Sequence, residues 1–222
     1  MLKNIDAILF DMDGTLVDSM WVWSSVDEDY IEKYNLTVPE DFLQQMEGKS
    51  FTETAQYYLD VFPTIPLTLE ELKKEWCEMA LDKYIHDVQM KDGAEQFIRR
   101  AHGLGIRLGI ATSNDRTLAQ QTLEARGISQ FFDVISTSCE VKKGKPAPDV
   151  YLEAAKRLGV APEKCLVFED VPMGILAGKN AGMKVCAVDD DFSRCQEARK
   201  KELADYYICS YDEIFESAYE VL

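Results

Sequence analysis

Short runs of apolar residues alternate with longer amphipathic stretches along most of this chain. Runs that are apolar throughout are typical of strands in a parallel sheet covered on both faces. Five runs have the length of a strand, at residues 7–10, 107–111, 134–136, 166–168 and 185–188. The amphipathic stretches predict helices at residues 94–102, 116–126, 149–158 and 173–181. Because strand and helix alternate, we predict an α/β fold with a doubly wound parallel sheet.

One long segment interrupts this alternation. It holds four stretches with a helical pattern, at residues 20–34, 39–46, 52–61 and 68–86, and no convincing strand. We therefore predict two domains. A core made of residues 1–17 and 90–222 carries a helical domain, residues 18–89, inserted after its first strand.

The charge balance of the chain excludes several kinds of partner. With 40 acidic and 24 basic residues the net charge is −16, which repels nucleic acids and anionic membrane surfaces. No apolar run reaches the roughly 18 residues of a membrane span, and none resembles a signal peptide. The six cysteines form no C-x-x-C pair, so we expect free thiols. We expect a cytoplasmic monomer or weak homodimer that binds neither nucleic acid nor membrane.

Polar side chains gather where the predicted strands end. They are Asp11 and Asp13, Thr112, Ser113 and Asn114, Lys145, and Glu169 and Asp170. In open α/β sheets ligands bind beyond the carboxyl ends of the strands, so we expect these side chains to converge on one rim. Carboxylates crowded in a low-dielectric pocket repel one another and need a cation. Oxygen ligands without histidine or thiol favour Mg²⁺ over zinc.

The stretch AILFDMDGTLVDS, residues 7–19, ends the first strand with two acids and a glycine. Beside a metal and a lysine, Asp11 would stay ionised and attack an electrophilic centre. Asp13 would carry a proton to the leaving oxygen and recover it from water. Gly14 allows a tight turn that exposes N–H groups to an oxyanion. Thr112, at the end of a later strand, would add a hydroxyl where phosphate commonly binds.

Four ordered motifs resemble those of a known family. They are DMDGTL, the Thr-Ser-Asn at 112–114, GKPAPD and FEDVPMGILAGKNAGM. Together they are similar to the motifs of the haloacid dehalogenase superfamily, close to its β-phosphoglucomutase-like phosphatase branch. The resemblance covers essentially the whole chain. It implies a Rossmann-like core, a helical cap inserted after the first motif, and Mg²⁺-dependent phosphoryl transfer through an aspartyl-phosphate.

The resemblance also implies roles for the acidic residues and the lysine. Asp11 would be the nucleophile and a metal ligand, and Asp13 the general acid/base whose backbone carbonyl also meets Mg²⁺. Asp170, with Glu169, would complete the metal site. Lys145 would neutralise the nucleophile and the phosphate.

The transferring phosphate is expected on Thr112, with Ser113 and Asn114 nearby. A net charge of −16 does not argue against an anionic substrate, provided that the pocket itself is positive. The resemblance also leads us to expect a cis peptide bond between Lys145 and Pro146.

Within the family, the second aspartate favours a phosphatase. Dehalogenases and phosphonate hydrolases of the superfamily lack it, so Asp13 counts against both. Mutases of the β-phosphoglucomutase kind carry a cap histidine shortly after the first motif, where this chain reads DSMWVWSS and has Trp23. Hydrolysis of monoesters is therefore our main prediction, and a phosphosugar mutase is the alternative.

Substrate choice is expected to depend on the helical domain, because the core motifs handle only the phosphate. Trp21 and Trp23 would line the cavity and stack on a sugar or base, or would only pack between the domains. Lys49 would either touch the substrate or be a solvated lysine. A small phosphorylated metabolite fits such an enclosed cavity, and sugar phosphates lead the list.

Two other classes of protein remain alternatives. A non-catalytic phosphate-binding protein would keep this fold, but the intact set of Asp11, Asp13, Lys145 and Asp170 argues against it. A phospho-accepting receiver domain also phosphorylates an aspartate beside Mg²⁺ on a parallel sheet. The large helical insertion and the paired aspartates argue against a receiver.

Overall fold

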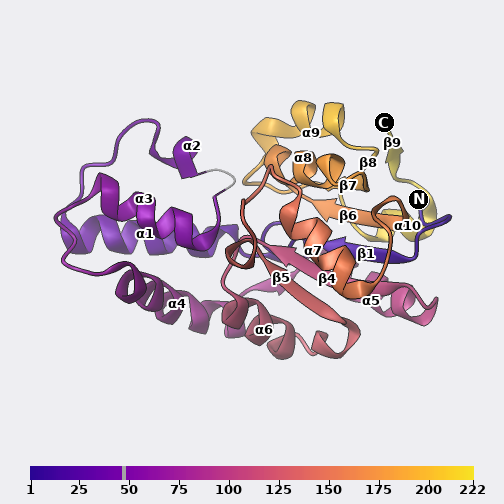
Figure 1. Ribbon diagram of the computed structural model, residues 1–222, viewed down its shortest axis with the longest axis horizontal. Coiled ribbons are helices and arrows are strands. Elements are labelled where there is room, and N and C mark those ends of the chain that lie inside the picture. The colour runs from indigo at the N-terminus through magenta and orange to yellow at the C-terminus, as the bar shows by residue number, and fades with distance from the viewer. Residues whose placement is uncertain (47–48) are drawn as a thin grey trace.

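The computed structural model describes residues 1–46 and 49–222, and its centre is a largely parallel sheet (Figure 1). Over the described residues this sheet has seven strands in the order β5-β4-β1-β6-β7-β8-β9, of which only β9 runs antiparallel to its neighbour. The strands are β1 (Ala7–Phe10), β4 (Arg107–Thr112), β5 (Val134–Thr137), β6 (Cys165–Glu169), β7 (Lys184–Val188), β8 (Tyr206–Ile208) and β9 (Glu220–Val221). All five predicted strands are confirmed, with ends that differ by at most one residue.

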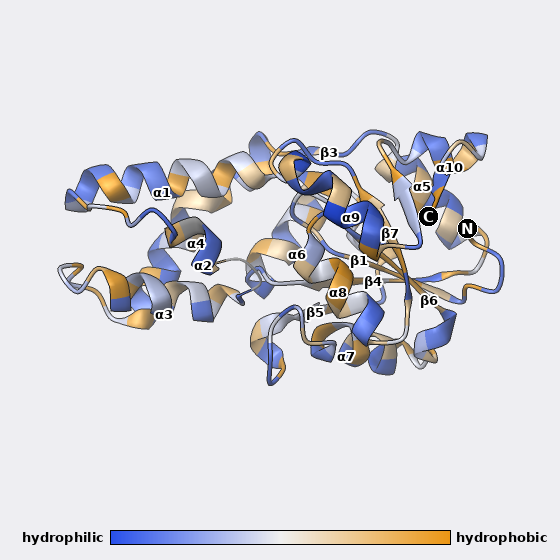
Figure 2. Ribbon diagram, turned by 90° about the horizontal axis from the view of Figure 1, so that it is seen from above, coloured by the Kyte–Doolittle hydropathy of each residue, from blue (hydrophilic) through white to orange (hydrophobic). Residues whose placement is uncertain are grey.

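Helices cover both faces of the sheet, which explains why the strands are apolar throughout. In β1, Ile8 and Phe10 pack on one face with α5 (Ala94–Gly103) and α6 (Arg116–Ala125). Ala7 and Leu9 point to the other face. That second face is covered by α7 (Asp149–Leu158), α8 (Pro172–Asn180) and α9 (Glu197–Leu203). Figure 2 shows these helices carrying both hydrophobic and hydrophilic residues, as expected for elements with one buried side.

In the described part of residues 18–89, four helices form the insertion that the sequence predicts. They are α1 (Met20–Tyr34), α2 (Phe42–Met46), α3 (Phe51–Val61) and α4 (Leu69–His86). Capping boxes set where the last two begin, since Ser50 pairs with Glu53 and Thr68 with Glu71. Aromatic rings fill the space between the helices. The ring centroid of Trp76 lies 4.9 Å from that of Tyr58.

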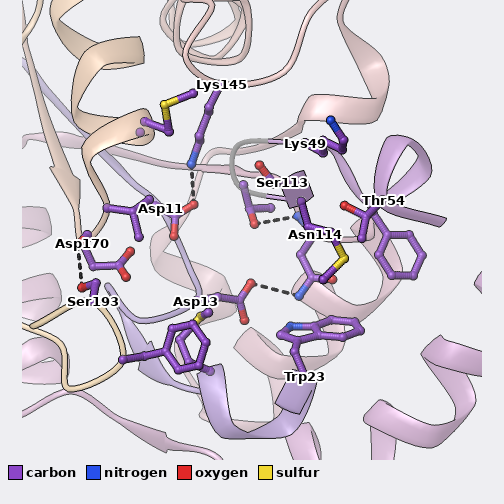
Figure 3. A pocket seen from close by; sticks show the side chains of 18 of the residues that line it. Asp11, Asp13, Trp23, Lys49, Thr54, Ser113, Asn114, Lys145, Asp170 and Ser193 are labelled. Carbon is purple, nitrogen blue, oxygen red and sulfur yellow. Dashed lines mark hydrogen bonds and ion pairs between the residues drawn. The ribbon is translucent and has the colours of Figure 1, made fainter. Parts of the chain in front are cut away.

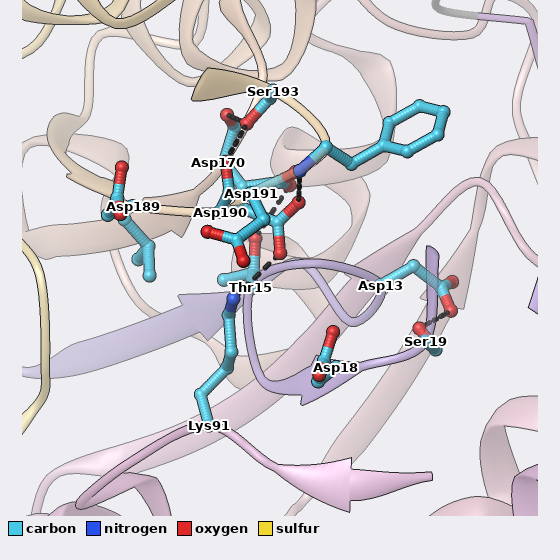
Figure 4. A network of polar contacts seen from close by, with 12 residues as sticks. Asp13, Thr15, Asp18, Ser19, Lys91, Asp170, Asp189, Asp190, Asp191 and Ser193 are labelled. Atoms are coloured by element: carbon cyan, nitrogen blue, oxygen red, sulfur yellow. Dashed lines mark hydrogen bonds and ion pairs between the residues drawn. The ribbon is translucent and has the colours of Figure 1, made fainter. Parts of the chain in front are cut away.

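The chain enters and leaves the insertion through a short antiparallel pair, β2 (Val17–Asp18) and β3 (Gln89–Met90). The sequence did not predict this pair, because strands of two residues carry no periodic pattern. The ion pair between Lys91 and Asp190, 2.7 Å long, ties the returning segment to the core (Figure 4).

Other features agree with the sequence predictions. All six cysteines are free thiols, and the Lys145–Pro146 bond is cis. Helix α10 (Asp212–Glu216) completes the C-terminal part. Among the described residues, no helix is both long and apolar enough to span a bilayer.

Candidate active site

The strand order brings the sequence-predicted acids together. Strands β4 and β5 lie on one side of β1, whereas β6, β7 and β8 lie on the other, so the order reverses beside β1. Phe10 of β1 is in register with Phe168 of β6, and the N–H of Asp11 donates to the Phe168 carbonyl over 3.0 Å. Asp11 therefore lies beside Glu169 and Asp170, at the position where open α/β sheets bind ligands.

Three carboxylates form a compact buried cluster at this point, and Figure 3 shows two of them, Asp11 and Asp170. Asp11, Glu169 and Asp170 each offer an oxygen, and these oxygens lie within 4.8 Å of one another. The three residues are almost fully buried. Such a set of oxygen donors fits a hard divalent cation, because nearby carboxylates in a dry site need positive charge.

Two glycines allow the chain to approach this cluster closely. Gly14 has a φ of +75°, and a Cβ there would lie 2.4 Å from an oxygen of Asp170. At Gly174, in the first turn of α8, a Cβ would lie 1.8 Å from an oxygen of Glu169. Larger residues at either position would collide with the carboxylates.

Lys145 supplies the buried positive charge of the cluster. Its Nζ lies 2.5 Å from Asp11 Oδ1 and 2.6 Å from Glu169 Oε1. The hydroxyl of Tyr151, on α7, donates to the same oxygen of Glu169 over 2.7 Å. Tyr151 was not predicted as a site residue, because nothing in its local sequence distinguishes it from other buried residues of an amphipathic helix.

The electrostatics indicate that one lysine does not balance three acids. Burial, with the nearby charges of Glu169 and Asp13, raises the pKa of Asp11 to about 8 in spite of Lys145. Burial and the charges of Glu169 and Asp11 also raise the pKa of Asp170. Burial lowers the pKa of Lys145, but the attraction of Asp11 and Glu169 outweighs this and raises it overall. A further cation would relieve the repulsion.

Asp170 is oriented by residues outside the cluster (Figure 4). Thr15 Oγ1 donates to its carboxylate over 3.0 Å, and Ser193 Oγ donates to its backbone carbonyl over 2.8 Å. The buried Lys200 in turn donates to Ser193 Oγ over 3.0 Å. The strand end that carries Asp170 is thus fixed before any ligand binds.

Asp13 lines the same pocket, but its carboxylate is not part of the compact cluster. Three donors hold it. Ser19 Oγ lies 2.6 Å from Asp13 Oδ1, the Tyr84 hydroxyl donates to the same oxygen, and Asn114 Nδ2 lies 3.0 Å from Asp13 Oδ2. Burial raises the pKa of Asp13, while these hydrogen bonds oppose the shift.

The predicted phosphate-binding residues do not all face the pocket. Thr112, Ser113 and Asn114 line it. Gly14 does not belong to the lining, and its N–H donates to the Val17 carbonyl over 2.9 Å. The expectation that this turn exposes N–H groups to an oxyanion therefore does not hold for the N–H of Gly14 itself, because the turn uses that N–H internally.

A cavity of about 680 Å³ extends from the carboxylates to the helical insertion. Trp23 and Lys49 line it, as the sequence analysis allowed. Trp21 does not: it is 41% exposed and its indole N–H donates to the Asp18 carbonyl over 3.0 Å. The prediction that Trp21 lines the cavity is therefore wrong, because α1 turns that ring toward solvent.

The insertion adds lining residues that the sequence analysis missed. They are Met20, Ser24, Asp27, Gln44, Thr54 and Trp76, among others. The Tyr58 hydroxyl donates to Asp27 Oδ1 over 2.7 Å, and burial raises the pKa of Asp27. No motif marks these positions, since only the packing of the four helices decides which face meets the cavity.

Comparisons with known proteins agree with this geometry. Residues 8–188 match the family of haloacid dehalogenase-like hydrolases. A probable pseudouridine-5'-phosphatase of Drosophila melanogaster is 32% identical over 86% of this chain and 84% of that protein. A phosphorylated carbohydrates phosphatase of Thermotoga maritima is 30% identical over 81% of this chain and 83% of that protein.

Solved structures share the whole fold. CbbY from Rhodobacter sphaeroides, crystallised with phosphate, is 25% identical with a TM-score of 0.83, covering 95% of this chain and 96% of that one. A β-phosphoglucomutase from Clostridium difficile has a TM-score of 0.77 at 23% identity, covering 96% of this chain and 97% of that one. At 23% identity, the similarity to the β-phosphoglucomutase shows a shared fold and nothing more.

Proposed function

The chain belongs to the haloacid dehalogenase-like hydrolases and is a phosphatase of small phosphorylated metabolites, and we propose that it works through a phosphorylated Asp11. One observation above all supports this mechanism. A buried carboxylate, 2.5 Å from Lys145 Nζ, lines a pocket that also contains Asp13.

The proposed reaction has two steps. An oxygen of Asp11 bonds to phosphorus, the ester bond breaks, and Asp13 gives its proton to the departing alkoxide. Water then attacks the aspartyl-phosphate, Asp13 takes the proton of that water, and inorganic phosphate leaves with Asp11 restored. Lys145 neutralises the charge on Asp11 and on the phosphoryl oxygens throughout.

We propose Mg²⁺ as the cation of the acidic cluster. Asp11 and Asp170 would ligate it together with the backbone carbonyl of Asp13, and Glu169 would complete the site from behind. When bound, the ion supplies positive charge for the transferring phosphoryl group. Thr112, with Ser113 and Asn114, would hold the phosphoryl oxygens.

We propose that the helices of residues 18–89 act as a cap over a core of residues 1–17 and 90–222, and that sugar phosphates are the leading substrates. The Thermotoga relative, named for phosphorylated carbohydrates, supports this class. Trp23, Lys49 and Asp27 come from the insertion, line the same cavity and would contact the sugar. A mutase remains the second candidate, favoured only by the shared fold with β-phosphoglucomutase.

A panel of phosphorylated metabolites tests this function. We expect repeated release of inorganic phosphate, with the highest kcat/KM for a sugar phosphate. A mutase would instead return an isomer of the substrate with little free phosphate. A single labelling event without turnover would indicate a receiver-like protein, and binding without either outcome would contradict an enzyme.

Removal of divalent cations should abolish activity. We expect excess EDTA to lower kcat on p-nitrophenyl phosphate by at least about 100-fold, and added Mg²⁺ to restore it, because the buried carboxylates repel phosphate when no cation is bound. Zn²⁺ serves as the comparison ion. Full turnover in excess chelator would contradict the metal assignment.

Mg²⁺ should also stabilise the fold, more at high pH than at low pH. An exposed aspartate has a pKa of 3.8, whereas the pKa of Asp11 in the folded metal-free chain is raised to about 8. Between these values the folded state binds more protons than the unfolded state, so stability falls as pH rises. The rise in Tm on adding Mg²⁺ should therefore be larger at pH 8 than at pH 5, as measured by calorimetry.

Replacing Asp13 by Asn should slow the enzyme without unfolding it. An amide cannot donate an acidic proton, and general acid/base groups contribute about 10²–10⁴-fold. We expect a larger loss of kcat/KM on glycerol 3-phosphate than on p-nitrophenyl phosphate, because kcat/KM covers the steps through phosphorylation of Asp11 and nitrophenolate departs in that step without a proton. Equal rates for Asp13→Asn and wild type on both esters would contradict the role of Asp13.

A further inference from the structure

The carboxylate of Asp13 is held by side chains from three parts of the chain. Figure 3 shows its contact with Asn114, and Figure 4 shows its contact with Ser19. Ser19 lies in the segment that enters the insertion, Asn114 follows β4 of the core, and Tyr84 belongs to α4 of the insertion. All three are buried, and Tyr84 is completely so. Asp13 is thus fixed where the core and the insertion meet.

Tyr84 is the member of this set that comes from the last helix of the insertion. Its hydroxyl donates to Asp13 Oδ1, and Asn114 Nδ2 lies 3.2 Å from the same hydroxyl. The Tyr84 ring centroid lies 6.1 Å from that of Trp23, which lines the cavity. Tyr84 therefore links the substrate cavity of the insertion to an acidic residue of the core.

The end of α4 is also attached to the core. Arg126, at the end of α6, donates from its guanidinium to the carbonyl of Ile85, the residue after Tyr84. Helix α4 is thus attached to the core at Ile85, next to Tyr84, and the Tyr84 ring lies near Trp23 within the insertion. A tyrosine fixed in this way places its hydroxyl at a definite point.

With Ser19 and Tyr84 on one oxygen and Asn114 on the other, the direction of the Asp13 carboxylate is set by its neighbours. Proton transfer is sensitive to small displacements of the donor, since a good hydrogen bond needs both correct distance and correct angle. A group that fixes the carboxylate therefore affects proton delivery more than it affects phosphate binding.

We propose that Tyr84 is a positioning residue for the proton transfer carried out by Asp13, so that delivery of the proton to the leaving group depends on the docked helix α4. This inference rests on the proposed function, in which Asp13 is the general acid. It assigns a catalytic contribution to the insertion beyond substrate choice.

The test uses Tyr84→Phe, which keeps the ring and removes only the hydroxyl. Hydrogen bonds to a charged group are strong enough that we expect kcat/KM on glycerol 3-phosphate to fall by at least about tenfold. On p-nitrophenyl phosphate, whose leaving group needs no proton, kcat/KM should change less than about threefold. The comparison uses kcat/KM because it covers only the steps through phosphorylation of Asp11, before water attacks the shared intermediate.

Tyr30→Phe is the matched control. Tyr30 is another buried tyrosine of the insertion and does not belong to the pocket lining. We expect this variant to keep the wild-type ratio of the two activities. Equal losses on both esters in Tyr84→Phe would overturn the proposal, because they indicate a role in folding or phosphoryl transfer.

A double-mutant cycle with Asp13→Asn distinguishes failure of the positioning role of Tyr84 from failure of the proposed function. If Tyr84 acts through Asp13, Tyr84→Phe should have almost no further effect on glycerol 3-phosphate in the Asp13→Asn background. Additive losses would overturn the positioning role alone. Failure of the proposed function would give a different result: the Asp13→Asn variant would lose kcat/KM equally on glycerol 3-phosphate and on p-nitrophenyl phosphate.

Discussion

The Asp11→Asn variant should lose essentially all turnover, with kcat lower by about 10⁴-fold or more. An amide does not form the bond to phosphorus on which both proposed steps depend. The loss should appear equally on p-nitrophenyl phosphate and on alkyl phosphates, because both kinds of ester transfer their phosphoryl group to the same carboxylate. Stopped assays with labelled substrate should also detect no phosphorylated protein.

This variant should nevertheless fold, which makes the result informative. The folded metal-free chain holds the Asp11 carboxyl at a pKa of about 8 because burial disfavours its charge. Removing that charge should leave Tm at pH 8 without metal equal to or above the wild-type value. Asp6→Asn, an exposed aspartate just before β1, is the control that keeps full activity. Near-normal turnover in Asp11→Asn would place the nucleophile elsewhere.

The Lys145→Met variant should lose both activity and stability. Methionine has a similar length but no charge, so the phosphoryl oxygens and Asp11 lose their buried cation. We expect kcat to fall by about 10²–10³-fold. Leaving Asp11 and Glu169 without Lys145 should also cost about 3–5 kcal/mol of unfolding free energy in the metal-free chain, as urea titration would measure.

Two further variants make the Lys145 result specific. Lys143→Met changes an exposed lysine of the same loop and should alter neither quantity. Adding Glu169→Gln to Lys145→Met removes one of the unpaired charges, so it should recover part of the lost stability without recovering activity. If Lys145→Met keeps wild-type stability and kcat, the ion pairs of Lys145 do not have the role proposed here.

Much of the core follows from local sequence patterns. The run from Ala7 to Phe10 is apolar throughout because both faces of β1 are covered, and the run therefore signals a buried parallel strand. Strands β8 and β9 were not predicted, because they are only three and two residues long and carry aromatic or polar residues. A hydrophobic pattern cannot reveal a strand that is too short to contain a repeat of that pattern.

The residues at the strand ends could be predicted for a similar reason. Parallel strands place their carboxyl ends on one rim, so acids at the ends of several strands are expected on that rim. The strand order then brings Asp11 beside Asp170. Strand topology did not reveal that the N–H of Gly14 is hydrogen-bonded inside the turn, because topology does not say which backbone groups a turn uses for its own hydrogen bonds.

The sequence by itself determined the alternation of strands and helices, the inserted helices, and the acids and lysine at the strand ends, because each of these depends on residues close together in the chain. Only the tertiary structure decided that Tyr84 reaches Asp13, that Tyr151 reaches Glu169, and that Trp23 but not Trp21 faces the cavity. Those contacts depend on how helices rotate and pack against a distant part of the chain. A helical pattern shows which residues are buried, but not which buried residue will meet a particular carboxylate.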